Sequence, residues 1–329
     1  MHKRALTALA LAITWTLAVS FAQSPPATAP ATTPATSAPV KILLLHVNDS
    51  HGQISGTAAV GGYARLATLV EQLRAEQVER VFLTDSGDIL SRGDALTRQT
   101  LGAANFELMK RLKFDAWTPG NGDFYDGLGV LGARIKQAGF PTLASNVTLK
   151  DTGQCLARPY VIAKAGGVRV AMFGLCTVHM IPPLEKQLSV EEPIATARRL
   201  VPELRKQADL VVAVTHIGYG EDVRLAEAVA GIDVILGGHT HTHLPAGRLV
   251  KGPDGGETLI GQAGEHLDHL GVVRLTMAPR EGGYVRESFS ARTIALDARV
   301  KMDPQIKAMI ARLAEAATQP TETAPAAAP

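Results

Sequence analysis

Short apolar runs that alternate with amphipathic stretches constrain the fold of this chain more than any other feature of its sequence. The first run, VKILLLH at residues 40–46, is apolar at nearly every position, as in a strand that is buried on both faces. The following stretch, 61–77, carries apolar residues at helical spacing. Further predicted strands are 81–84, 114–118, 141–145, 160–163, 168–175, 210–215, 234–236, 258–262 and 271–277, and further predicted helices are 95–112, 127–138, 192–207, 222–229 and 303–316. This alternation predicts an α/β fold, with a mixed sheet or two sheets that face each other.

The two ends of the chain differ in composition from the middle. Residues 1–22 combine a basic start, an apolar stretch and small residues before position 22, which is the layout of a secretory signal peptide. An uncleaved anchor is the alternative, although the apolar run is shorter than the roughly 20 residues of a spanning helix. Residues 23–39 and 318–329 are rich in Pro, Ala and Thr, and predict a linker and a disordered tail. We therefore expect one exported domain over 40–317, in the periplasm or outside the cell, with no transmembrane anchor after cleavage.

Charge and cysteine content narrow the range of partners. The net charge is +2, there is no basic block, and aromatic residues make up only 5% of the chain, so no nucleic-acid partner is expected. A protein partner finds no support in the sequence. The two cysteines, Cys155 and Cys176, could pair in an exported protein or remain two separate thiols. Neither has the Cys-x-x-Cys spacing of a metal site.

Metal-ligand side chains follow five of the predicted strands, always at the end where the strand finishes. In α/β sheets this edge is where ligands bind. Carboxylate, carboxamide and imidazole groups are the ligands that first-row divalent ions prefer. These side chains are Asp49 and His51, Asp88, Asn121, His216, and the pair His239 and His241.

The spacing of these residues favours two ions rather than one. Asp49 and His51 are two positions apart, so their side chains point the same way on an extended strand end, and His239 and His241 repeat this spacing. A carboxylate such as Asp88 can bridge two ions, and two ions about 3.5–4 Å apart form the clamp used for phosphoryl hydrolysis. Each residue alone has an ordinary explanation, such as a turn aspartate or a surface histidine. Together and in this order, they predict a two-metal site.

These motifs resemble those of the calcineurin-like metallophosphoesterase superfamily. The resemblance covers about residues 40–276 and is closest to the catalytic domain of secreted bacterial 5′-nucleotidases and 2′,3′-cyclic phosphodiesterases. It rests on Asn-Asp-Ser-His-Gly at 48–52, Asp-Ser-Gly-Asp at 85–88, Gly-Asn at 120–121, Thr-His at 215–216 and Gly-Gly-His-Thr-His at 237–241.

The resemblance implies a four-layer α/β/β/α sandwich with two mixed sheets, two divalent ions (manganese, zinc or iron) and a phosphate ester or nucleotide as substrate. It also implies how the ions are held. One ion would take Asp49, His51, Asp88 and His241. The other would take Asp88, Asn121, His216 and His239, with Asp88 bridging the two.

The loop TPGNGDFYDG at residues 118–127 departs from the family pattern. The family has a histidine after the asparagine, which contacts the phosphoryl group and can protonate the leaving oxygen, and an aspartate that orients this histidine. Here Gly122 and Tyr125 stand at these two positions, while Asn121 is kept. Loss of a general acid typically costs about 10²–10⁴-fold in rate. Asp123, Tyr125, Asp126 or His243 could replace it, or the leaving group could need no proton.

Three functions are consistent with this pattern. The first is an exported two-metal phosphoesterase, in which Asp88 and Asn121 serve the chemistry and the family's C-terminal nucleotide-binding domain is absent. The second is a degenerate metal-loaded protein that binds phosphate, a nucleotide or another oxyanion without turnover. The third is a sulfur-ester hydrolase on the same scaffold. Glu265 could lie near the site, whereas His179, His266 and His269 are expected at the surface.

Overall fold

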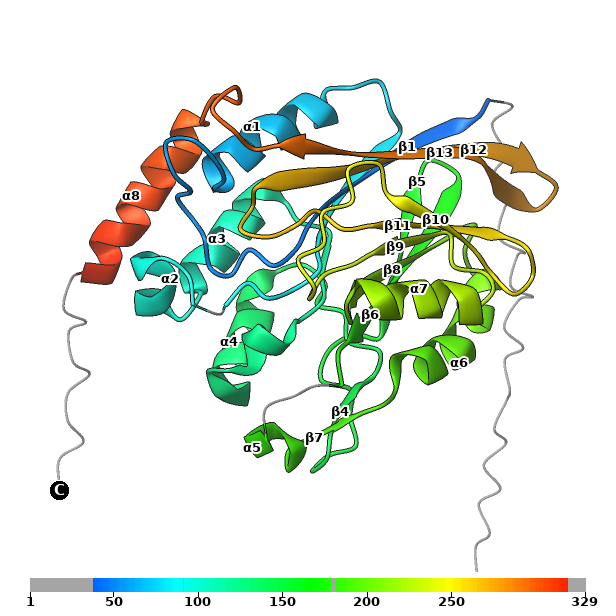
Figure 1. The fold of residues 1–329 in the computed structure, drawn as a ribbon, viewed down its shortest axis with the longest axis horizontal. Coiled ribbons are helices and arrows are strands. Elements are labelled where there is room, and N and C mark those ends of the chain that lie inside the picture. The colour runs from blue at the N-terminus through cyan, green and yellow to red at the C-terminus, as the bar shows by residue number, and fades with distance from the viewer. Residues whose placement is uncertain (1–37, 91, 179–181, 319–329) are drawn as a thin grey trace, which may run out of the picture. The chain divides into compact units, whose positions relative to one another are not determined.

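The computed structural model describes residues 38–90, 92–178 and 182–318. The predicted signal peptide, the linker up to residue 37, His179 and the tail from residue 319 lie outside the described residues (Figure 1). Within the described ranges, no helix is both long and apolar enough to cross a membrane. Cys155 is exposed, Cys176 is buried, and the two are unpaired.

The first sheet has five strands in the order β13-β12-β1-β2-β3. The strands β1 (Val40–Val47), β2 (Arg80–Asp85) and β3 (Ala116–Trp117) run parallel to one another. Next to β1, β12 (His269–Arg280) runs antiparallel, and β13 (Gly283–Ala295) pairs antiparallel with β12 at the edge. The sheet is therefore mixed, with its parallel strands grouped on one side.

The second sheet has six strands in the order β10-β11-β9-β8-β6-β5. Its parallel strands are β6 (Val168–Cys176), β8 (Leu210–His216), β9 (Val234–Leu236) and β11 (Glu257–Gly261). The outer strands β5 (Tyr160–Ala165) and β10 (Arg248–Lys251) are antiparallel to their neighbours. A separate small sheet pairs β4 (Val147–Leu149) with β7 (Leu188–Val190).

Helices cover the outer face of each large sheet. Their bounds are α1 Tyr63–Arg74, α2 Ala95–Thr100, α3 Ala103–Leu112, α4 Gly127–Ala138, α5 Pro182–Glu185, α6 Pro193–Arg205, α7 Tyr219–Ala228 and α8 Pro304–Thr318, and a 3-10 helix, η1, covers Asn121–Phe124. Local sequence sets several of these starts. The Asp94 side chain accepts from Thr97 N at the start of α2, and the Glu192 side chain accepts from Ala195 N at the start of α6.

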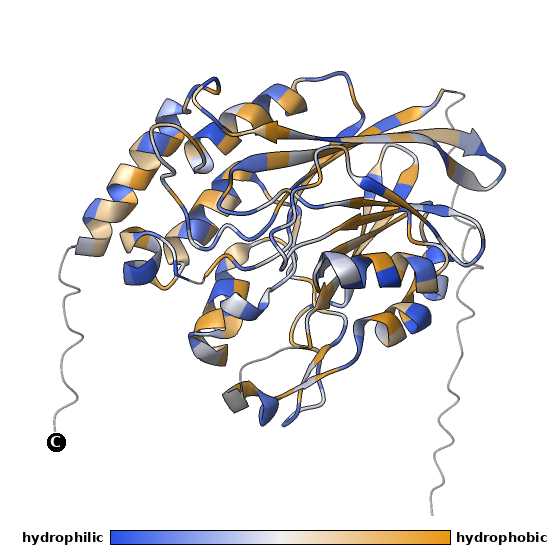
Figure 2. Ribbon diagram, in the orientation of Figure 1, coloured by the Kyte–Doolittle hydropathy of each residue, from blue (hydrophilic) through white to orange (hydrophobic). Residues whose placement is uncertain are grey.

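Three apolar layers hold the sheets and helices together, and β1 shows how they arise. Leu43 and Leu45 face the helices α1, α3 and α8, whereas Ile42 and Leu44 face the second sheet, because successive strand residues point to opposite faces. A third apolar layer lies between the second sheet and α6 and α7. Four structural layers with three apolar interfaces confirm the predicted α/β/β/α sandwich, and Figure 2 shows the apolar colour concentrated along the strands of both sheets.

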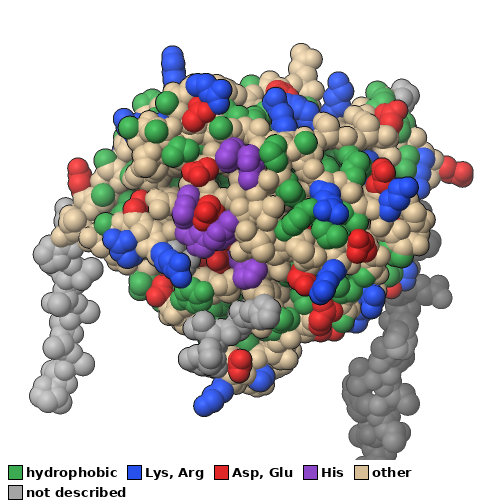
Figure 3. All heavy atoms as spheres, viewed as in Figure 1, with side chains coloured by type: hydrophobic (Ala, Val, Ile, Leu, Met, Phe, Trp, Pro, Cys, Tyr) green, Lys and Arg blue, Asp and Glu red, His purple; other side chains and the backbone are tan. Residues whose placement is uncertain are grey.

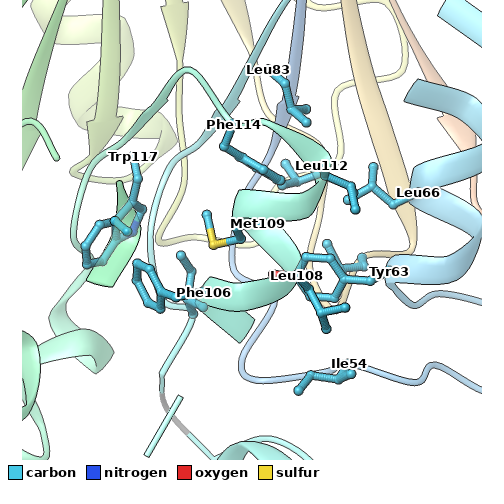
Figure 4. Close-up of a cluster of buried hydrophobic side chains, with 14 of the residues drawn as sticks. Ile54, Tyr63, Leu66, Leu83, Phe106, Leu108, Met109, Leu112, Phe114 and Trp117 are labelled. Atoms are coloured by element: carbon cyan, nitrogen blue, oxygen red, sulfur yellow. The ribbon is translucent and has the colours of Figure 1, made fainter. Parts of the chain in front are cut away.

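The helix-covered side of the first sheet contains the largest buried aromatic side chains. Figure 4 shows Phe106, Met109 and Leu112 of α3 in the cluster that also contains Tyr63 of α1 and Trp117 of β3. Phe106 and Trp117 make an edge-to-face contact with ring centroids 4.9 Å apart. This packing fixes α3 against β3 and so positions the loop that follows β3.

Two predicted elements differ from the structure, and one long strand was not predicted. The single helix predicted over 95–112 is two helices, because Leu101 and Gly102 adopt left-handed φ values of 47° and 76°. Gly102 also packs so closely on Leu90 that a Cβ would lie 2.0 Å from Leu90 Cδ2. The strand predicted over 141–145 forms only isolated bridges at Thr142 and Leu143.

The third difference is a strand that the sequence analysis missed. Among the described strands β13 is the longest, yet its residues alternate between partly buried and exposed positions, because it lies at the sheet edge. Its polar sequence therefore lacks the continuous apolar run that marks the central strands. The short elements β4, β7, β10 and α5 were not predicted for a similar reason, since each is only three or four residues long.

Candidate metal centre

The strand ends that carry the predicted ligands are joined by hydrogen bonds between the two sheets. Ser86, after β2, donates from Oγ to Leu236 O of β9 at 2.8 Å. Thr118, after β3, donates from Oγ1 to Val214 O of β8 at 2.9 Å. Because these bonds connect the carboxyl ends of parallel strands in both sheets, the following loops meet at one edge of the sandwich. Figure 3 shows histidine side chains gathered around acidic ones on one face.

The backbone at this edge is held in an uncommon conformation. Five of the seven predicted ligands have positive φ values: Asp49 (49°), His51 (45°), Asp88 (58°), His239 (79°) and His241 (53°). Such a conformation costs a non-glycine residue about 1–3 kcal/mol and persists only where the surroundings impose it. Here Asp49 N donates to Gly87 O and His51 N donates to Asp88 O, both at 2.8 Å. Positive φ values clustered at the predicted ligands mark this edge as a functional site.

The first group of converging ligand atoms comes from Asp49, His51 and His241. The Nε2 atoms of the two histidines lie 2.8 Å apart. Asp49 Oδ1 lies 3.5 Å from His241 Nε2 and 3.9 Å from His51 Nε2. Three ligand atoms from two loops therefore point to one position.

The second group comes from Asp49, Asp88 and His216. His216 Nε2 lies 3.4 Å from Asp88 Oδ1 and 3.9 Å from Asp49 Oδ1. The other ring nitrogen, Nδ1, lies 2.6 Å from the carbonyl of Ser86. Because a carbonyl only accepts, Nδ1 carries the proton and Nε2 presents its lone pair. Asp49 belongs to both groups, so it lies between them, and Asp88 Oδ2 also lies 3.9 Å from His51 Nδ1 of the first group.

The two remaining predicted ligands lie together. Asn121 Oδ1 is 2.8 Å from His239 Nδ1, and the rings of His239 and His216 have centroids 5.1 Å apart. The structure thus brings all seven predicted side chains to one edge, in contact with one another.

Two buried atoms within these groups have no hydrogen-bond partner. In the part of the chain that the structure describes, Asp49 Oδ1 and His216 Nε2 are both buried and unpaired. Such an atom normally costs about 1–3 kcal/mol when it is left without a partner. These two atoms, a carboxylate oxygen and an imidazole nitrogen, converge without other hydrogen-bond partners. Because each offers a lone pair, they fit as ligands of divalent cations.

The comparison with protein families assigns these residues to a known class. The model of the family described as Calcineurin-like phosphoesterase matches residues 42–243, a span that contains all seven side chains. The chain belongs to the calcineurin-like phosphoesterase family. Members of this family use divalent metal ions, which agrees with the two groups of ligand atoms.

Individual calcineurin-like phosphoesterases resemble the chain over most of its length. The snake venom 5′-nucleotidase of Naja atra is 31% identical, over 83% of this chain and 56% of its own. The 5′-nucleotidase of Vibrio cholerae is 34% identical, over 65% of this chain and 42% of its own. The solved structure of the 5′-nucleotidase precursor from Thermus thermophilus matches with a TM-score of 0.75 at 27% identity, over 84% of this chain and 59% of its own. The chain thus spans about half the length of the curated relatives it matches.

The charge states of two predicted ligands suit them to bind cations. Burial raises the pKa of Asp49, but contact with His241, the charge of His216 and a hydrogen bond from Asn48 outweigh it, so the pKa lies below its ordinary value. Burial is the largest cause that lowers the pKa of His51, which favours the neutral ring that a metal binds. Asp49 is therefore an anion and His51 a neutral donor near neutral pH.

The loop after β3, which contains Gly122, is ordered around Asp123. This carboxylate is fully buried and accepts from the backbone N–H groups of Asp88, Ile89, Leu90 and Gly120, each at 2.8 Å. Burial is the largest cause that raises the pKa of Asp123 to about 7, while bonds from these N–H groups lower it. Asp123 therefore joins the loops after β2 and β3, and it faces the interior rather than a substrate.

The other residues that the sequence analysis named as possible proton donors are His243, Asp126 and Tyr125. His243 Nε2 is 2.8 Å from Thr293 Oγ1, and its ring stacks on His269 with centroids 3.9 Å apart. Asp126 is exposed at the start of α4, and its side chain makes no capping bond there. Tyr125 does contact the side chain of a predicted ligand, since its hydroxyl accepts from Asn121 Nδ2 at 2.8 Å.

Two supporting residues were understated by the sequence analysis. Asn48 donates to Asp49 Oδ2 at 2.7 Å and to Gly264 O at 2.6 Å, and its Oδ1 accepts from Ala263 N at 2.8 Å. Glu265 Oε2 lies 3.0 Å from His241 Nδ1. The expectation that Glu265 could lie near the site is thus confirmed, whereas its contact with His241 in particular was not predicted.

Proposed function

We propose that this protein is an exported phosphoesterase that uses two divalent ions to hydrolyse a phosphomonoester or phosphodiester. The observation that carries the proposal is the pair of converging ligand groups, in which Asp49 Oδ1 and His216 Nε2 are buried without partners among the described residues. The family match and the identity to 5′-nucleotidases support phosphate ester chemistry. Export rests on the signal-peptide pattern of residues 1–22.

In this proposal one ion is held by Asp49, His51, Asp88 and His241, and the other by Asp88, Asn121, His216 and His239. When bound, the ions would polarise the phosphoryl group and activate water for hydrolysis. The chain orients its ligands for this task. Gly122 N donates to Asp88 Oδ1 at 2.6 Å and holds that carboxylate between the two groups.

The glycine at position 122 limits which substrates the site can turn over, because it offers no imidazole. Asp123 is buried in backbone contacts, and His243 bonds to Thr293 instead. A leaving group that is already stable as an anion, such as a phenolate or a second phosphate, needs no proton from the protein. A sugar alkoxide needs one, so nucleoside monophosphates should be slow substrates relative to aryl esters.

The combination of a kept ligand set and a glycine at position 122 also supports a second candidate function. A site that keeps its ligands but lacks the family histidine can bind phosphate, a nucleotide or another oxyanion without turnover. The proposal of hydrolysis is favoured because the ligand set is complete and geometrically assembled. A protein that only captures anions has no need of seven convergent ligands.

The first test is hydrolysis of bis-p-nitrophenyl phosphate and p-nitrophenyl phosphate by metal-stripped protein, before and after manganese or zinc is added back. Asp88→Asn should abolish the metal-dependent rate, whereas Asp126→Asn, which changes an exposed carboxylate of the nearby loop, should leave it unchanged. Stoichiometric metal binding without turnover of either ester would shift the assignment to the oxyanion-binding function.

A second test restores the missing acid. Gly122 does not have a positive φ, so histidine meets no backbone strain there. If the rest of the site is competent, Gly122→His should raise the rate on a poor leaving group by about 10²–10⁴-fold, the usual contribution of a general acid. No gain on AMP, in a variant that still binds two ions, would contradict a site that lacks only its acid.

A further inference from the structure

Tyr125 occupies a defined place beside the proposed metal site, although it departs from the family pattern. It follows the 3-10 helix η1, and its backbone N donates to Gly122 O. Buried Phe124 and Asp123 fix η1 from the interior, which leaves Asn121 and Tyr125 on its outer side. The Tyr125 side chain is 44% exposed, so packing in the core does not explain it.

The Tyr125 hydroxyl contacts the side chain of Asn121. Asn121 Nδ2 donates to this hydroxyl at 2.8 Å, and Asn121 Oδ1 lies 2.8 Å from His239 Nδ1. A carboxamide has a donor end and an acceptor end of nearly equal shape, and only its oxygen can bind a cation. In the observed arrangement the phenol accepts from the nitrogen end, and the oxygen end faces His239.

We infer that Tyr125 is a positioning residue, which orients the Asn121 carboxamide so that its oxygen binds the second ion. The inference rests on the proposed two-metal function. Groups that hydrogen-bond metal ligands from outside typically change metal affinity or activity by about 10–100-fold when they are removed.

The contact between Tyr125 and Asn121 predicts that loss of the hydroxyl weakens the binding of one ion and leaves the binding of the other unchanged. The second proposed ion takes Asn121, which is the partner of the Tyr125 hydroxyl. The first proposed ion takes its ligands from the loops after β1, β2 and β9. The contacts described above for these ligands are with one another, with His216, and with Asn48, Gly122 and Glu265, rather than with the Tyr125 hydroxyl. Removal of the hydroxyl should therefore weaken one of two binding events. A general loosening of the fold would weaken both.

The test is calorimetric titration of metal-stripped protein with Mn²⁺, for wild type, Tyr125→Phe and Tyr125→Leu. We expect two binding events in wild type, with one about 10–100-fold weaker in both variants and the other unchanged. The two variants should agree, because the hydroxyl rather than the ring carries the effect. Tyr160→Phe, on the edge strand β5, is the matched control and should titrate like wild type. The melting temperature of the metal-free variants should equal that of wild type.

A spectroscopic measurement separates the ions directly. With two equivalents of Mn²⁺, wild type should give the electron paramagnetic resonance spectrum of a coupled pair, and Tyr125→Phe should give a larger signal from isolated ions. Two unchanged binding events in Tyr125→Phe would overturn the inference and leave the proposed function standing. Equal weakening of both events would also overturn it. A wild-type protein that binds fewer than two ions would instead refute the two-metal function itself.

Discussion

A buried histidine outside the metal site should make the stability of this protein fall in mild acid. His46 of β1 is 2% exposed, and among the described residues neither ring nitrogen has a hydrogen-bond partner. The ring lies against two glycines of other strands. A Cβ on Gly271, its register partner on β12, would lie 1.9 Å from His46 Cε1, and a Cβ on Gly261 of β11 would lie 2.9 Å from it. The imidazole thus fills a space that only glycine leaves open, and this environment disfavours a charge on the ring.

The size of the effect follows from the pKa of this imidazole. Burial lowers the pKa of His46 to about 4, whereas an unfolded histidine titrates near its ordinary value of about 6.5. The unfolded chain therefore binds a proton at pH values where the folded chain does not. The stabilising contribution is complete above pH ~6.5 and is lost as the pH falls towards ~4. At pH 5, about 1.5 units below the unfolded pKa, the loss is roughly 2 kcal/mol at about 1.36 kcal/mol per unit.

Urea unfolding at pH 7 and at pH 5 measures this loss in wild type and in His46→Leu. Both proteins should be metal-stripped, so that protonation of the predicted ligands contributes equally and cancels in the comparison. We expect the free energy of unfolding of wild type to fall by about 2 kcal/mol more than that of the variant between the two pH values. Leucine is close to histidine in volume, so the variant should fold at pH 7 within about 1.5 kcal/mol of wild type. An equal fall in both proteins would refute the reasoning, because the titrating group would then lie elsewhere.

Four further substitutions test the surroundings of the site. Gly129→Ala should raise the free energy of unfolding by about 1 kcal/mol, because this position in α4 has open space for a Cβ. In the same urea assay, Gly127→Ala should lower the free energy of unfolding, because Gly127 has a φ of 82°. Glu265→Gln should weaken Mn²⁺ binding by about 10-fold in calorimetry, because the carboxylate partner of His241 Nδ1 is lost, and an unchanged affinity would show that this contact is incidental. Asn48→Ala should lower the free energy of unfolding by about 2–4 kcal/mol, because it leaves buried backbone groups unpaired, and a near-neutral result would mean that water replaces the amide.

The convergence of the candidate ligands at one edge could largely be predicted from the sequence, because these residues are placed by local rules, while their role as metal ligands stays a prediction. Each follows an apolar strand directly, so once the strands are recognised, the position of the ligand in the fold follows. Asp49 comes two residues after β1 ends, and His216 is the last residue of β8. The glycine at position 122 and the tyrosine at position 125 stand out in the sequence only against the motif that the resemblance implies.

Contacts between segments that are far apart in the sequence could not be predicted from any pattern of neighbouring residues. The pairing of His241 with Glu265, and of His46 with Gly261 and Gly271, depends on loops and strands that meet only after the sheets have packed. The edge strand β13 escaped prediction because one side of it is unpaired and exposed, so it needs no apolar run.

The sequence by itself thus determined the layered fold and which side chains are candidate ligands, because apolar periodicity and side-chain chemistry are properties of neighbouring residues. The tertiary structure alone decided which atoms converge, where Leu101 and Gly102 divide one helix into two, and what the Tyr125 hydroxyl contacts. These features arise from packing and hydrogen bonds between residues that become neighbours only in the folded chain.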